Sequence, residues 1–140
     1  MANVNVNDDY QLVDILRSSK TIAVVGMSPN PARPSNEVAR YLMANGYTVI
    51  PVNPGHREIL GLSCYPALDA VPLAVDIVDV FRNSAEVLPV AEAAVRIAAK
   101  CLWFQLGVIN DAASQLASDA RLKVVTNRCI KIDHAWLIGR

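Results

Sequence analysis

The clearest chemical pattern in the sequence is "VVGMSPNPARPS", residues 24–35, where an apolar run enters a glycine. Gly26 permits a tight turn or a close backbone approach, and Ser35 is a suitable N-cap for a helix whose N-terminus would be positive. Three prolines restrict the loop, so less entropy is lost when a ligand orders it. The stretch therefore predicts a rigid phosphate-binding turn, with hydroxyl donors at Ser28 and Ser35 and a counter-charge at Arg33.

This turn departs from the dinucleotide fingerprint GxGxxG. Ser28 and Pro31 occupy the positions of its second and third glycines, and the second predicted strand ends in Asn53 rather than in a ribose-binding acid. Ordinary NAD binding is therefore disfavoured. NADP or another nucleotide is an alternative ligand, with Arg33 or Arg57 meeting a 2′-phosphate.

Arginines follow three of the predicted strands, at Arg33, Arg57 and Arg82. A guanidinium grips phosphate oxygens in bidentate fashion, so three of them at one sheet edge suit a ligand with more than one phosphate. Each one taken alone is at least as consistent with a solvated surface charge. Phe81, directly before Arg82, is a candidate to lie against an adenine.

The sequence offers little catalytic chemistry. Asp76 and Asp79 are three residues apart in a predicted strand, so their side chains would project to opposite faces and would not form a carboxylate pair. Asp133 and His134 have no nucleophile that the sequence places beside them, and we expect a surface or capping histidine.

The three cysteines are Cys64, Cys101 and Cys129, an odd number without CxxC spacing, which indicates neither a disulfide scaffold nor a zinc site. Cys101 is expected in the core. Cys129 follows the fifth predicted strand, where Arg128 or Lys131 would favour its thiolate, which makes it a redox candidate beside the alternative of a packed, unreactive thiol.

Short apolar runs rich in Val and Ile alternate with segments of helical period. Runs of this length that are apolar on both faces are typical of parallel strands buried in a sheet. The predicted strands are residues 21–26, 47–52, 75–80, 101–106 and 122–126. They predict an α/β, doubly wound Rossmann-like fold with a five-stranded parallel sheet of order 3-2-1-4-5, flanked by helices.

The predicted helices lie at the chain start, between the strands and after the last strand. They cover residues 9–19, a helix from the Ser35 cap to Asn45-Gly46, a short helix near 66–70, residues 85–99, a helix after a cap at Asn110 or Asp111, and residues 131–138. Pro89 is tolerable only in a first turn or between two helices. Trp103 and Phe104 are expected in the core. Ligands of such sheets bind at the carboxyl ends of the strands.

The composition bounds the classes of protein. The 140 residues are 53% hydrophobic and carry thirteen basic and thirteen acidic side chains, which excludes a disordered chain and an overall basic field for nucleic acid. We see neither a membrane-spanning run nor a secretion signal, so we expect one cytoplasmic domain over residues 1–140 without a metal site. A homo-oligomer or a protein partner stays open.

Several stretches together resemble the small stand-alone CoA-binding proteins, whose fold matches the N-terminal CoA-binding domain of the succinyl-CoA synthetase alpha subunit. The stretches are "IAVVGMSPNPARPSNEVARYL", "GYTVIPVNPG", "VDIVDVFR", "LWFQLGVIND" and "NRCIKIDH". They follow the order and approximate spacing of the family over residues 12–138.

The resemblance implies a site for CoA or acyl-CoA at the strand ends. The implied residues are Gly26, Met27, Ser28, Arg33 and Ser35 around the pyrophosphate, Asn53, Pro54 and Arg57 at the nucleotide end, Phe81 and Arg82 along the adenosine or pantetheine path, and Gln105 and Gly107 on the neighbouring loop.

The sequence departs from the synthetase pattern in two respects. Gly55, His56 and Arg57 stand where synthetase relatives often have a lysine pair, and the phosphorylated histidine of the synthetase lies in a second domain that these 140 residues do not contain. We therefore expect a CoA or acyl-CoA binding protein without evident catalytic machinery, in a regulatory or carrier role. A redox-linked protein that forms a mixed disulfide between Cys129 and the CoA thiol is an alternative.

Overall fold

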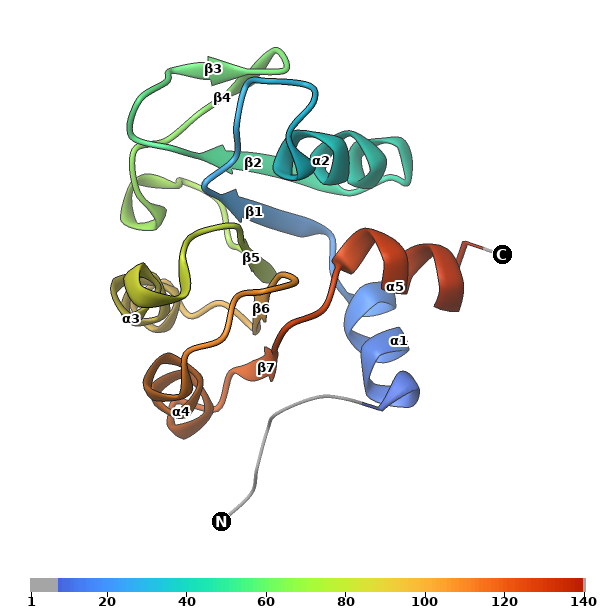
Figure 1. The fold of residues 1–140 in the computed structure, drawn as a ribbon, viewed down its shortest axis with the longest axis vertical. Coiled ribbons are helices and arrows are strands. Elements are labelled where there is room, and N and C mark those ends of the chain that lie inside the picture. Colours follow the sequence, from blue (N-terminus) through green and yellow to red (C-terminus); the bar gives the residue numbers. More distant parts are fainter. Residues whose placement is uncertain (1–7, 140) are drawn as a thin grey trace.

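A five-stranded parallel sheet runs through the centre of the molecule in the computed structural model, which describes residues 8–139 (Figure 1). Its strands are β1 (Thr21–Val25), β2 (Thr48–Val52), β5 (Ile77–Val80), β6 (Cys101–Phe104) and β7 (Lys123–Val125). Apolar side chains on both faces of each strand are buried, because helices cover the sheet on both sides. The predicted fold class is confirmed.

The strand order differs from the expected one in the position of the third strand. The order along the sheet is β2-β1-β5-β6-β7, which is 2-1-3-4-5 when these five strands are numbered along the chain. The third strand, β5, therefore pairs with β1 and not with β2. The strand after β1 in the chain, β2, lies on one side of β1, and the later strands lie on the other side. The topological switch point is therefore at the first strand, as expected, between β1 and β5.

The helices form two layers around separate halves of the core. One layer contains α1 (Asp9–Ser18), α2 (Pro34–Ala44) and α5 (Ile130–Leu137), and the other contains α3 (Leu88–Arg96), α4 (Asp111–Asp119) and the short 3-10 helices η1 (Leu68–Ala70) and η2 (Ser84–Glu86) (Figure 1). Trp103 packs toward the first layer and Phe104 toward the second. Both are fully buried, as predicted.

The connection from β2 to β5 holds structure that the sequence did not reveal. It forms a small antiparallel hairpin of β3 (Glu58–Ile59) and β4 (Leu62–Ser63), and the predicted helix near 66–70 is the single turn η1. Each hairpin strand is two residues long, too short to show a period.

The helix ends follow their local sequence with one correction. Asn110 caps α4 by accepting a hydrogen bond from the Ala113 N–H, and Gly46 ends α2 with a φ of +91°, both as predicted. Ser35 is not the N-cap of α2: Arg33 holds that position and Pro34 begins the helix. A proline suits the first helical turn, since its missing N–H would have no partner there.

His134 is a second correction, because it is buried rather than a surface or capping residue. Its Nδ1 lies 2.7 Å from the Tyr41 hydroxyl, and the Tyr47 ring meets its edge. Burial lowers the pKa of the imidazole. The hydrogen bond joins α5 to α2, so His134 belongs to the packing of these helices.

Asp79 is the one polar side chain of the described residues with buried, unpartnered oxygens. It lies on β5 between Val24 and Trp103, and its side chain is fully buried. Desolvation raises the pKa of this carboxyl well above its usual value. Over residues 8–139, no helix is both long and apolar enough to cross a bilayer.

Candidate functional site

The turn after β1 depends on a glycine. Gly26 has a φ of +84°, and its N–H donates to the carbonyl of Val52, 2.9 Å away. A Cβ added at Gly26 would lie 2.9 Å from the Phe81 carbonyl oxygen and 3.0 Å from the Arg82 side chain. The carboxyl ends of β1, β2 and β5 therefore meet at this residue, and a larger side chain does not fit.

Residues 26–35, which we call the collar, are held in shape by hydrogen bonds as well as by prolines. The Ser28 N–H donates to Ser35 Oγ at 2.9 Å, and the Asn30 N–H donates to Ser28 Oγ at 3.1 Å. The Asn36 side chain donates to the Ser28 carbonyl at 2.9 Å. Both serine hydroxyls thus act as acceptors inside the collar, with their own protons left to donate.

A second set of contacts fixes the collar from α2. Arg40 donates to Asn36 Oδ1 at 2.9 Å and to the Pro31 carbonyl at 3.0 Å. Sequence reasoning missed both Asn36 and Arg40. Their spacing of four residues on a helix was the available signal, since such residues share one face.

Arg33 stands exposed at the N-terminus of α2, and among residues 8–139 no carboxylate forms an ion pair with it. It lines a cleft of about 360 Å³, the first cleft, together with Gly26, Ser28, Pro34, Ser35 and Phe81. An unpaired guanidinium, a helix N-terminus and serine hydroxyls meet there, which is an arrangement that attracts phosphate.

Of the residues after β2, Asn53 holds the turn in shape and Arg57 is exposed to solvent. Asn53 donates to the Met27 carbonyl at 2.9 Å and accepts from the Gly55 N–H at 2.9 Å, so its side chain shapes the turn. The Met27 side chain is fully buried in the core, which leaves only its backbone near the collar. Arg57 is exposed just before β3 and lines none of the three clefts described here.

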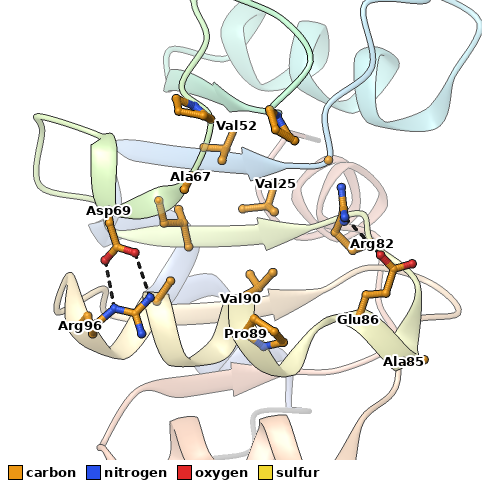
Figure 2. Close-up of a pocket in the computed structure, with 15 residues that line it drawn as sticks. Val25, Val52, Ala67, Asp69, Arg82, Ala85, Glu86, Pro89, Val90 and Arg96 are labelled. Atoms are coloured by element: carbon orange, nitrogen blue, oxygen red, sulfur yellow. Dashed lines mark hydrogen bonds and ion pairs between the residues drawn. The ribbon is translucent and has the colours of Figure 1, made fainter.

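The second cleft has a volume of about 550 Å³ and lies between the β2–β5 connection and α3 (Figure 2). Val25, Val52 and Val90 give it an apolar lining. An ion pair stands at each end, as Figure 2 shows: Arg82 with Glu86 at 3.2 Å, and Arg96 with Asp69 at 2.9 Å. Such a cleft suits a ligand group that is largely apolar along its length and has polar atoms at its ends.

The third cleft, of about 560 Å³, lies beyond Arg82 and is lined by Phe81, Gln105, Gly107 and Cys129 among others. Gln105 is buried and accepts the Ile130 N–H at 3.1 Å, so its amide secures the start of α5. The Gly107 N–H donates to Asn127 Oδ1 at 2.7 Å.

Ser84 fixes the opposite side of the loop that carries Gly107. Its hydroxyl donates to the Gly107 carbonyl at 3.2 Å and accepts the Ile109 N–H at 2.9 Å. Ser84 and Asn127, which sequence reasoning missed, therefore set the shape of this loop; Asn127 has a φ of +58°, a conformation that asparagine tolerates well.

The three clefts adjoin one another along the carboxyl edge of the sheet, since each shares lining residues with the other two, and we call them together the groove. Gly26 lines the first and second clefts, Arg82 the second and third, and Phe81 the first and third. The structure therefore brings together the collar, Pro54, Phe81, Arg82 and Gly107. Arg57 stays outside this set.

Cys129 is half-buried in the third cleft, and the cations near it in sequence are engaged elsewhere. Arg128 forms two hydrogen bonds to Asp133, at 2.7 and 3.0 Å, and Lys131 lies 2.6 Å from Glu37. Asp133 and Arg128 thus pin the start of α5. Among the described residues, no group of three His, Cys, Asp or Glu side chains could hold a metal ion.

A doubly wound sheet with a glycine turn and a helix N-terminus at its switch point defines the class of α/β domains that bind ligands at the carboxyl edge. Residues 20–135 match the family model described as a CoA binding domain. The chain belongs to this family.

Three similar proteins illustrate the range of the family. The uncharacterized protein YneT of Bacillus subtilis is 38% identical over 125 residues, which are 89% of this chain and 93% of YneT. A hypothetical protein from Pyrococcus horikoshii has a TM-score of 0.94 at 38% identity and covers 99% of this chain and 98% of its own. The ADP-forming acetate–CoA ligase I of Archaeoglobus fulgidus is 41% identical over 58 residues, 41% of this chain and 8% of the ligase.

Proposed function

We propose that the protein binds CoA or acyl-CoA in the groove at the carboxyl edge, with the pyrophosphate at the collar. The observation that carries the proposal is the unpaired Arg33, which lines the first cleft together with Gly26 at the N-terminus of α2. Membership of the CoA binding domain family supports it.

The groove matches the unequal parts of CoA. A pyrophosphate needs local positive charge and hydrogen-bond donors, which Arg33, Ser28 and Ser35 supply. The adenosine and pantetheine ends of CoA lie on opposite sides of the pyrophosphate, and the second and third clefts adjoin the collar at Gly26 and at Pro34. Phe81 and Arg82 stand along that path.

The 3′-phosphate is assigned to Arg82, with Arg57 as the second candidate. Arg82 pairs with Glu86, and both side chains are substantially exposed, so a phosphate can replace the carboxylate at little cost. Arg57 is exposed on the neighbouring turn and reaches the groove only if its side chain or the turn moves.

Titration calorimetry with CoA, 3′-dephospho-CoA, pantetheine and NADP tests the proposal. We expect CoA to bind most tightly, 3′-dephospho-CoA more weakly and pantetheine weakest, because each step removes charge-assisted hydrogen bonds. Each such bond contributes about 1.5–3 kcal/mol. No CoA binding at millimolar ligand would overturn the proposal, and tighter binding of NADP would favour the nucleotide alternative.

The role we propose is that of a cytoplasmic carrier or regulator that holds CoA rather than transforms it. The described groove presents the Cys129 thiol and the ion-paired carboxylates Asp69 and Glu86 beside its arginines, serines and amides, but no nucleophile hydrogen-bonded to a base. Mass spectrometry of acetyl-CoA after incubation with the protein should show an unchanged ligand, and hydrolysis that Arg33→Ala abolishes would contradict this role.

The position of Cys129 in the third cleft, which Phe81 and Gly107 also line, supports a second function, the formation of a mixed disulfide with CoA. In thiol–disulfide exchange its thiolate would attack the disulfide of oxidised CoA; the CoA–CoA sulfur bond breaks, a Cys129–CoA bond forms and one CoA thiolate leaves. Intact-mass analysis should show one CoA adduct that Cys129→Ser abolishes and that Cys64→Ser and Cys101→Ser, at two buried thiols, retain. An adduct that persists in Cys129→Ser rejects this site.

A further inference from the structure

Two adjoining pockets lie at the amino edge of the sheet, opposite the groove. The larger, of about 400 Å³, is where α1 ends and β6 and β7 begin, and the smaller, of about 260 Å³, lies beside the turn from α2 to β2. Ser19, directly after α1, lines both. We call this pair the amino-edge pockets.

Five positive side chains line the amino-edge pockets. Lys100, Arg121 and Lys123 line the larger, Arg17 and Lys20 line the smaller, and no aspartate or glutamate lines either. The chain as a whole carries equal numbers of acidic and basic residues, so this edge is a local concentration of positive charge.

Nearby carboxylates balance only part of this charge. Asp76 pairs with Lys100 at 3.2 Å and Asp14 with Lys123 at 3.5 Å. Burial alone would raise the pKa of Asp76, but the Lys20 and Thr21 N–H groups, at 2.8 and 3.0 Å, together with Lys100 hold it below its usual value. Asp76 is therefore an ionised clamp between β1 and β5.

The other three cations stand without a carboxylate partner among residues 8–139. They are Arg17, Lys20 and Arg121. Arg121 has a φ of +70°, held by hydrogen bonds from its own N–H to Ser118 and from the Leu122 N–H to Ala117. Glycine or asparagine would occupy this conformation at lower cost than arginine does.

Ser19 adds a neutral donor to the pockets. The residue as a whole is 8% exposed, and no group of the described chain forms a hydrogen bond with its hydroxyl. Because this hydroxyl is not among the buried, unpartnered atoms, it is open to the pockets and free to donate to a ligand. It lies between the cations of the two pockets.

We propose that the amino-edge pockets bind a small phosphate-type anion with two or more negative charges. Cations from the ends of α1 and α4 and the starts of β6 and β7 converge on concave, small pockets, which fit a compact ion better than a macromolecular surface. Ser19 would donate its hydroxyl to the same ion. This site is separate from the collar, which lies at the other end of β1.

Inorganic pyrophosphate, followed by amide NMR shifts, is the probe. We expect saturable shifts at Ser19, Lys100 and Arg121, retained in Arg33→Ala, which disables the collar. Arg121→Gly and Arg121→Asn both suit the left-handed backbone and should fold at least as stably, as thermal melting will verify. Each should weaken pyrophosphate binding at this edge about tenfold or more, since a charge-assisted contact is lost.

Two results would overturn the proposal. One is the absence of saturable shifts at Ser19 and Arg121 while the collar amides respond. The other is an unchanged affinity in both Arg121→Gly and Arg121→Asn. Because neither result depends on CoA, failure of the CoA proposal leaves this test intact.

Discussion

The two edges of the parallel sheet present positive charge in different ways. At the carboxyl edge, Arg33 stands on a collar whose backbone is fixed by Gly26 and by side chains of α2, and apolar clefts adjoin it. At the amino edge, cations line two pockets of about 400 and 260 Å³. The comparison indicates that shape, more than charge, makes the carboxyl edge suited to a long ligand with one charged segment.

Glycine substitutions at the two edges should give the largest difference in stability between the edges. Gly26→Ala combines a left-handed backbone with a contact of 2.9 Å to the Phe81 carbonyl, whereas Gly46→Ala has the same backbone problem and no atom within 4 Å. We expect Gly26→Ala to lower the free energy of unfolding by about 2–5 kcal/mol and Gly46→Ala by about 1–2 kcal/mol. Urea denaturation measures both.

The same pair separates shape from stability in ligand binding. Gly26→Ala should lose CoA binding even where it is folded, because its new methyl group displaces the β5 loop, while Gly46→Ala should keep wild-type affinity. Equal stability losses for the two variants would show that the collar does not depend on the close approach at Gly26.

Arginine substitutions come next in size. Arg33→Ala should weaken CoA binding about 10- to 100-fold through the loss of charge-assisted hydrogen bonds, with little change in stability because the side chain is exposed. Arg121→Gly, at the amino edge, should leave CoA affinity unchanged. Titration calorimetry of the two variants against wild type checks this, and similar weakening by both would mean that CoA binding follows general charge rather than the collar.

Two aspartates give the smallest and most diagnostic effects, of opposite sign. Asp79, inside the sheet, has a raised pKa, so the folded state disfavours its ionised form and the free energy of unfolding should fall as pH rises above about 4. Asp76, at the amino edge, has a lowered pKa, so its contribution is present above about pH 4 and is lost as pH falls through the lowered value.

Denaturant titrations from pH 3 to pH 8 measure these slopes. Asp79→Asn should remove the decline at higher pH, and Asp76→Asn should lose stability at neutral pH relative to wild type while resembling it in acid. A flat profile for the difference between wild type and Asp79→Asn would show that the buried carboxyl is satisfied in solution.

Much of the fold was predictable because its signals are local. Short Val- and Ile-rich runs predicted all five strands of the sheet, and Asn110 and Gly46 marked helix ends through their own side chains or backbone preference. The position of β5 was not predictable in this way. Which side of β1 a strand occupies depends on how the whole β2–β5 connection packs, and no single residue encodes that choice.

The residues of the candidate site likewise divide into those with a local sequence signal and those whose role depends on contacts in space. Gly26 and Arg33 were proposed from sequence because a glycine turn before a helix has a known use, and Arg82 because it follows a strand. Asn36 and Ser84 were missed because their roles consist of hydrogen bonds to backbone groups several residues away in the collar or in another loop. The burial of His134 likewise depends on α2 and α5 meeting in space.

A crystal structure of the protein with CoA tests the central claim most directly. We predict the pyrophosphate within hydrogen-bonding distance of Arg33 and the first turn of α2, with the two ends of CoA in the second and third clefts. CoA bound at the amino edge, or with its pyrophosphate remote from the collar, would contradict this account.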